Sequence, residues 1–292
     1  MIKLFYQILM ALSQRWGLWI FYMAAWTVAT GYFLFFPRRV AVSVRFYRAL
    51  FPGRPGWYAI WCAWQQFHSF IHPYLDRFLL ETSGKLHCTK EGWEYMEAAF
   101  REKSGGVLLM SHVGNWDVAA HLLKKEGAPL MLFMGRKERE QIEATQKEGL
   151  RQSGVEVIAS QADAASPLQI LEGARSIRNG WLISMAGDRP RPGQSTLAAR
   201  FLNHTVHLPE TPFALAVMTG APLYVFFSLR TGRQRYHFVV YPPIRPTGGS
   251  RRERKQRIRQ AAEAYAAILE QTVRQYPFQW HHFEPFLSRS EH

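Results

Sequence analysis

Beyond about residue 86, short apolar runs alternate with stretches in which apolar residues recur every three or four positions. Short apolar runs bounded by Gly, Pro or polar clusters are typical of strands. They predict strands at Val107–Met110, Leu130–Met134, Val155–Ile158, Trp181–Met185 and Leu223–Ser228. The stretches between them predict helices at Glu91–Lys103, Trp116–Glu126, Glu138–Ser153 and Pro167–Arg178. This alternation predicts an α/β fold with a central, mostly parallel sheet flanked by helices. The strand-rich region Val206–Tyr241 favours an antiparallel extension.

The first forty residues have a different pattern. No charged residue occurs between Trp16 and Pro37, and the run Leu18–Phe36 is almost wholly apolar. Its length is close to the roughly 20 residues that cross a bilayer as a helix. Aromatic residues lie near both ends of the run, as is typical of a membrane interface. The pattern predicts a membrane-anchoring helix that spans the bilayer, with an interfacial helix and a buried soluble helix as the alternatives.

Arginines follow the apolar run at positions 38, 39, 45 and 48, whereas only Lys3 and Arg15 precede it. This bias predicts that the main domain faces the cytoplasm, at the inner (cytoplasmic) membrane. A second aromatic stretch covers residues 57–80, where Trp57, Trp61, Trp64, Phe67 and Ile71 are spaced as on one helix face. This stripe predicts a helix packed on the main core; the alternatives are an acyl-chain groove and a surface in contact with lipid.

The composition adds a strong positive charge. Lys and Arg number 36 against 22 Asp and Glu, for a formal net charge of +14. Such a charge favours polyanionic partners. No nucleic-acid-binding motif accompanies it, so we expect a membrane surface and an acidic carrier rather than nucleic acid. Part of this charge is in a basic run at the start of a predicted final helix, Arg251–Tyr276.

The two cysteines, Cys62 and Cys88, form neither a disulfide framework nor a metal site, and His68 with His72 lacks a third ligand.

The segment 105–123 carries the first candidate chemistry. A predicted strand ends at Ser111, a polar turn follows, and a helix begins near Trp116, with Asn115 as its N-cap. His112 therefore lies at the carboxyl end of a strand, where α/β sheets bind ligands. If the turn doubles back, Asp117 can reach the imidazole, and such a pair activates a hydroxyl group. The alternative is a capped helix in which Asp117 complements the helix dipole and His112 is an ordinary loop residue.

Polar clusters also follow two other predicted strands. Asp188 and Arg189 lie in the loop Gly187–Gly193, and Arg136 follows Gly135. Arginine suits a phosphate group or a carbonyl oxygen that gains charge. Three such clusters at strand ends favour a site over solubilising loops.

These residues resemble a known family. The block His112–Asp117 (HVGNWD) resembles the HX4D motif of the glycerolipid and lipid A acyltransferase superfamily, and the wider pattern is similar to the lauroyl/myristoyl-type lipid A biosynthesis acyltransferases. The resemblance continues through FMGR at Phe133–Arg136, GDR at Gly187–Arg189, TGAPLYVFF at Thr219–Phe227 and YPFQWHHFEPF at Tyr276–Phe286. Glycerophosphate acyltransferases carry a phenylalanine-proline-glutamate-glycine block where this chain has MAGDRP, so the resemblance favours the lipid A branch.

The resemblance implies an O-acyltransferase in which His112 is the general base and Asp117 its partner. It also implies that Arg136, Asp188 and Arg189, beside Asn115, bind the phosphorylated acceptor or the carrier. The acyl donor would be an acyl carrier protein or coenzyme A thioester, with no cofactor and no metal. We expect residues 1–56 to form the anchor and juxtamembrane segment and residues 57–292 the acyltransferase domain, with an aromatic helical part at 57–85 and an α/β core at 86–292. The alternatives are a non-catalytic lipid-binding member of the fold and a thioester or lipid hydrolase.

Overall fold

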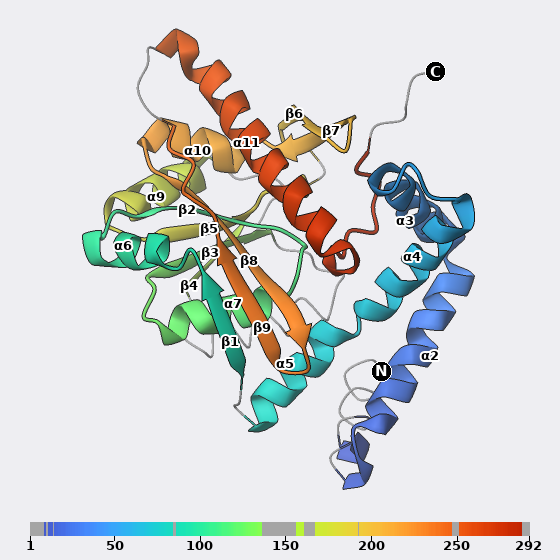
Figure 1. Ribbon diagram of the computed structural model, residues 1–292. Coiled ribbons are helices and arrows are strands. Elements are labelled where there is room, and N and C mark those ends of the chain that lie inside the picture. Colours follow the sequence, from blue (N-terminus) through green and yellow to red (C-terminus); the bar gives the residue numbers. More distant parts are fainter. Residues whose placement is uncertain are drawn as a thin grey trace. The chain divides into compact units, whose positions relative to one another are not determined.

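The computed structural model describes residues 9, 11–13, 15–83, 86–135, 156–160, 167–191, 193–246 and 251–287 (Figure 1). The chain divides into two compact units. The first unit is Met1–Lys85 with Phe278–Pro285, and the second is Leu86–Pro277 with Phe286–His292. The boundary predicted between the anchor (1–56) and the acyltransferase domain (57–292) stays a prediction.

The first unit is helical. It contains α2 (Trp19–Phe35), α3 (Pro37–Leu50), α4 (Gly56–Ser69) and α5 (His72–Ser83). α2 ends before Pro37 because proline has no backbone N–H and disfavours helical geometry in the residue that precedes it, here Phe36. Pro37 itself suits the first turn of α3.

The predicted helix Leu18–Phe36 corresponds closely to α2, and the chain bends directly after it. α2 has 17 residues, and α3 continues at an angle of 90° to it. Within the described residues, no individual helix combines the length and hydropathy of a membrane span; α2 and α3 meet both criteria only as a bent pair, by length and composition. The spanning role of Leu18–Phe36 is not confirmed.

Aromatic contacts hold the helices of this unit together. The ring centroid of Phe33 in α2 lies 5.1 Å from that of Trp64 and 5.6 Å from that of Phe67, both in α4. Trp280, from late in the chain, is buried, and its ring centroid lies 5.0 Å from that of Phe46. The stretch 57–80 contains two helices, α4 and α5, rather than one. The predicted stripe follows α4, where it is exposed at Trp57 but buried at Phe67, and its last member, Ile71, lies in the turn before α5.

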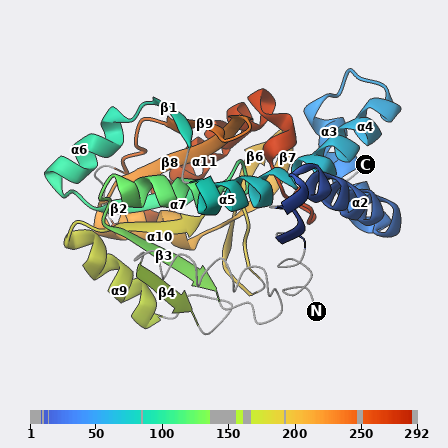
Figure 2. The same cartoon turned by 90° about the horizontal axis from the view of Figure 1, so that it is seen from below.

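The second unit has a seven-stranded sheet in the order β1-β9-β8-β2-β5-β3-β4 (Figures 1 and 2). The strands are β1 (His87–Glu91), β2 (Gly106–Met110), β3 (Leu130–Gly135), β4 (Glu156–Ser160), β5 (Leu182–Ala186), β8 (Leu223–Gly232) and β9 (Arg235–Val240). The five strands from β8 to β4 are parallel, whereas β9 is antiparallel to β8 and pairs in parallel with β1. The predicted mostly parallel sheet with an antiparallel extension is confirmed.

Helices flank this sheet, as predicted. α6 (Glu94–Glu102) and α7 (Trp116–Lys125) share a buried core with strand residues such as Leu108, Leu132 and Phe226. Further contacts with the sheet come from α9 (Pro167–Arg178) against β5 and from α10 (Thr211–Thr219) against β2. The long α11 (Arg254–Gln275) packs on α10 and on a hairpin of β6 (Thr196–Phe201) and β7 (His204–Pro209). The helix predicted at Glu138–Ser153 lies outside the described residues.

Candidate active site

The site begins with the register of two neighbouring strands. β2 and β5 are parallel, and Met110 pairs with Ala186 at their carboxyl ends. One residue further, the Gly187 amide donates to the Met110 carbonyl at 2.8 Å, so the ladder continues past both strands. The next residues are His112 and Asp188. Since parallel strands in register end at the same edge of a sheet, the fold brings these two side chains together although 76 residues separate them.

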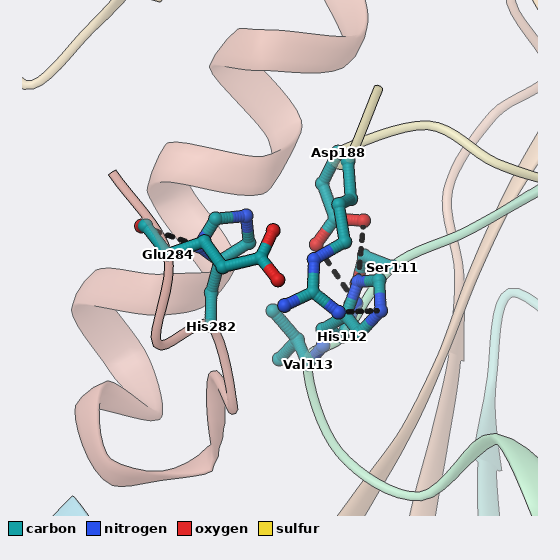
Figure 3. A network of polar contacts seen from close by, with 7 residues as sticks. Ser111, His112, Val113, Asp188, His282 and Glu284 are labelled. Atoms are coloured by element: carbon teal, nitrogen blue, oxygen red, sulfur yellow. Dashed lines mark hydrogen bonds and ion pairs between the residues drawn. The ribbon is translucent and has the colours of Figure 1, made fainter. Parts of the chain in front are cut away.

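His112 and Asp188 form a close pair (Figure 3). The backbone amide of His112 donates to Asp188 Oδ2 at 2.8 Å, and His112 Nδ1 lies 2.9 Å from Asp188 Oδ1. The Asp188 side chain has no exposed surface, whereas that of His112 is 32% exposed. A carboxylate only accepts hydrogen bonds, so Nδ1 carries the proton and Nε2 is the basic nitrogen of the neutral ring.

Arg189 adds a positive charge beside this ring. Its Nη1 atom lies 3.5 Å from His112 Nε2, at the outer limit of a hydrogen bond. A guanidinium remains charged at any ordinary pH and binds oxyanions through several N–H groups. A substrate oxygen near Nε2 would therefore lie close to both a base and a cation.

The turn after β2 is held by backbone contacts that require its particular residues. Gly114 has φ +77°, and a Cβ atom there would lie 2.0 Å from the Ser228 carbonyl oxygen of β8. The Asn115 amide donates to that same oxygen at 2.9 Å. Only glycine allows this close approach, which fixes the path of the chain directly after His112.

Asn115 forms the predicted N-cap. Its Oδ1 accepts from the Val118 amide at 3.4 Å, and its Nδ2 donates to the Tyr236 hydroxyl at 3.0 Å. The side chain is buried. These contacts connect the start of α7 to β9, and the binding role of Asn115 stays a prediction.

Of the remaining predicted site residues, the structure describes the side chain of Asp188 but not those of Asp117 and Arg136. Asp117 lies in the first turn of α7, but its side chain is outside the described part of the structure, as is the whole of Arg136. Their roles stay predictions. Asp188, predicted to bind substrate, is in addition a partner of the His112 ring. Across the described ranges, no group of three or more His, Cys, Asp or Glu side chains could hold a metal ion.

The fold and the site define an α/β protein with a histidine–aspartate pair at the carboxyl edge of a mostly parallel sheet. Residues 77–288 match the sequence model of the bacterial lipid A biosynthesis acyltransferase family. This match covers more than half of the chain, and the protein belongs to that family.

Curated relatives include mycobacterial proteins. The phosphatidylinositol mannoside acyltransferase of Mycobacterium tuberculosis is 25% identical over 194 residues, which are 66% of this chain and 58% of the relative. The corresponding enzyme of Mycolicibacterium smegmatis is 24% identical over 192 residues, 66% of this chain and 60% of the relative. The similarity therefore spans less than two thirds of the length of each relative.

Proposed function

We propose that the protein is a membrane-associated O-acyltransferase that moves a fatty acyl chain from a thioester to a hydroxyl of a polar lipid. The observation that carries this proposal is the His112–Asp188 pair, in which a buried carboxylate orients a partly exposed imidazole. This arrangement suits removal of a proton from an alcohol at Nε2. Membership of the acyltransferase family supports the same chemistry.

The reaction is a single displacement. The acceptor hydroxyl gives its proton to His112 Nε2 while its oxygen attacks the thioester carbonyl carbon. Collapse of the tetrahedral intermediate forms the ester and breaks the carbon–sulfur bond, and the leaving thiolate takes the proton from the imidazolium. Asp188 stabilises the imidazolium during this cycle, as the carboxylate does in serine hydrolases.

Arg189 has two roles in the proposal. Its guanidinium is placed to stabilise the oxyanion of the intermediate or to hold a phosphate of the acceptor or carrier. Asp117, Arg136 and Asn115 are proposed to complete the site, in the roles that the family resemblance implies.

The acceptor is proposed to be a lipid A-like or other polar lipid. The family description refers to lipid A and the curated relatives to phosphatidylinositol mannoside, both of which are polar glycolipids. The donor is either an acyl carrier protein or a coenzyme A thioester. The net charge of +14 favours acidic carriers and phosphorylated headgroups alike.

Membrane association is proposed through the helical unit and its bent pair α2–α3, at the inner membrane with the catalytic unit facing the cytoplasm. α2 exposes large apolar side chains along its length, among them Trp19, Met23, Trp26, Leu34 and Phe35. Arg38 and Arg39 follow at the start of α3 and are also exposed. Exposed aromatics beside arginines fit an interface that contains anionic headgroups.

The test is acyl transfer by purified protein in phosphatidylglycerol vesicles. The donors are palmitoyl-acyl carrier protein and palmitoyl-coenzyme A, and the acceptors are a lipid A precursor and phosphatidylinositol mannoside. We expect acceptor-dependent ester formation, and His112→Ala should lower its rate by at least about 100-fold. The matched control is His237→Ala, since His237 also bonds a carboxylate, Glu91 at 3.0 Å, on a different part of the sheet.

Two results would contradict the proposal. Thioester hydrolysis that proceeds equally without any acceptor would identify a hydrolase. Near-normal transfer by His112→Ala in a folded protein would remove His112 as the base.

A further inference from the structure

A buried hydroxyl lies beside Gly187, the residue before Asp188. Tyr265, in the middle of α11, has no exposed surface, and its ring lies 5.8 Å from that of Phe213 in α10. Its hydroxyl oxygen is among the buried polar atoms that have no hydrogen-bond partner in the described part of the chain. A buried, unpaired hydroxyl costs stability, which phenylalanine at the same position would avoid. The presence of tyrosine therefore calls for a reason beyond packing.

The hydroxyl end of Tyr265 lies directly against the loop that carries Asp188. A Cβ atom on Gly187 would lie 2.7 Å from the Tyr265 ring carbon Cζ and 2.8 Å from its hydroxyl oxygen. Gly187 thus lacks a side chain where the phenol needs the space. The same glycine pairs with Met110, so Tyr265 contacts the backbone that holds Asp188 in register with His112.

The contact with Gly187 places the Tyr265 hydroxyl next to the residue that precedes Asp188. Burial first, and the negative charge of Asp188 second, raise the pKa of Tyr265 well above its usual value. The phenol consequently stays protonated, and its O–H dipole can turn its positive end towards the carboxylate. In a buried site such a dipole stabilises a charge far more than it would in water.

We propose that Tyr265 is a positioning residue that acts through Asp188: its hydroxyl stabilises the buried carboxylate and restrains the Gly187–Asp188 backbone, so that His112 keeps its orientation. The proposal rests on the acyltransferase function for its kinetic consequence only. The coupling between Tyr265 and the His112 ring does not depend on the substrate.

The test is Tyr265→Phe, which keeps the ring and removes only the hydroxyl. We expect kcat for acyl transfer to fall about five-fold with KM unchanged, as loss of one such polar interaction would give. The melting temperature should change little, because losing the dipole near Asp188 and removing an unpaired buried hydroxyl have opposite effects on stability. A second readout needs no substrate: the NMR resonance of the His112 Nδ1 proton should shift.

Tyr224→Phe is the matched control. Tyr224 is also buried and also packs against a glycine, Gly106, but at the opposite end of β2 from His112. The Tyr224→Phe variant should have the same kcat and the same His112 Nδ1 proton resonance as the wild type. Wild-type kcat together with an unshifted resonance in Tyr265→Phe would overturn the proposal and leave Tyr265 as core packing. A shifted resonance in a protein that transfers no acyl group would support the coupling and contradict the proposed reaction instead.

Discussion

At the residue scale, the proposed chemistry depends on His112 and Asp188, two side chains that lie 76 positions apart in the chain. Asp188 is fully buried, and both of its oxygens accept hydrogen bonds from His112. The carboxylate therefore sets which imidazole nitrogen carries the proton. An amide in its place cannot stabilise the imidazolium and allows the wrong tautomer.

Asp188→Asn should accordingly lower kcat for acyl transfer by about 100- to 10,000-fold while the protein stays folded. The measurement is the initial transfer rate, with far-UV circular dichroism as the check on folding. Glu91→Gln is the control, because Glu91 is also a carboxylate that bonds a histidine, His237, but its side chain is exposed and lies on a different part of the sheet. Equal rates for Asp188→Asn and the wild type would show that the carboxylate has no part in the reaction.

The sequence predicted His112 as the base but only part of its surroundings. Its position after an apolar strand was readable from residues 105–123 alone. The hydrogen bond to Asp188 could not be predicted from the sequence. It depends on β2 and β5 being neighbours in register, and local periodicity does not specify the order of strands in a sheet. Tyr265 carried no signal at all, since one aromatic on the apolar face of a helix is indistinguishable from core.

At the element scale, burial decides which strands could be predicted. β2, β5 and β8 lie in the interior of the sheet and are apolar on both faces, so each appears as a continuous apolar run. β1 (HCTKE) is mostly exposed and polar, and β9 alternates buried positions with exposed or partly buried ones, so neither forms such a run. The helix predicted at Pro167–Arg178 has the same first and last residues as α9 in the structure.

The first turns of α4 present an exposed apolar stripe. Trp57, Ile60 and Trp61 are 65%, 49% and 42% exposed and lie three and four positions apart, on one helix face. Arg54, just before them, lies 5.5 Å from the Tyr58 ring centroid. An aromatic stripe beside an arginine is typical of contact with an anionic bilayer surface.

Replacing these three residues by Ser should weaken cosedimentation with phosphatidylglycerol vesicles by about tenfold or more, because insertion of the apolar area is lost. The control is Leu168→Ser with Leu171→Ser in α9, which removes side chains that are 77% and 63% exposed. Equal loss of binding in both variants would indicate nonspecific hydrophobic adsorption to the vesicles rather than a membrane-binding stripe on α4. Undiminished binding of the α4 variant would exclude the stripe as a contact.

At the scale of the whole molecule, the N-terminal helical unit also includes a short segment from late in the chain. The segment Phe278–Pro285 groups with the N-terminal helices, and Gln66 Nε2 donates to the Trp280 carbonyl at 2.6 Å across 214 positions. Sequence patterns located the aromatic residues at both ends but not their association, because no periodicity links segments so far apart. The α/β unit carries the candidate site.

The whole protein is proposed to add one acyl chain to one polar lipid of the cell. Lipid mass spectrometry of cells that lack the gene, compared with cells complemented by the wild type or by His112→Ala, tests this most directly. The account predicts that one lipid species loses the mass of a single acyl chain, that the wild type restores it, and that His112→Ala does not. An unchanged lipid profile without the gene, or full restoration by His112→Ala, would contradict it.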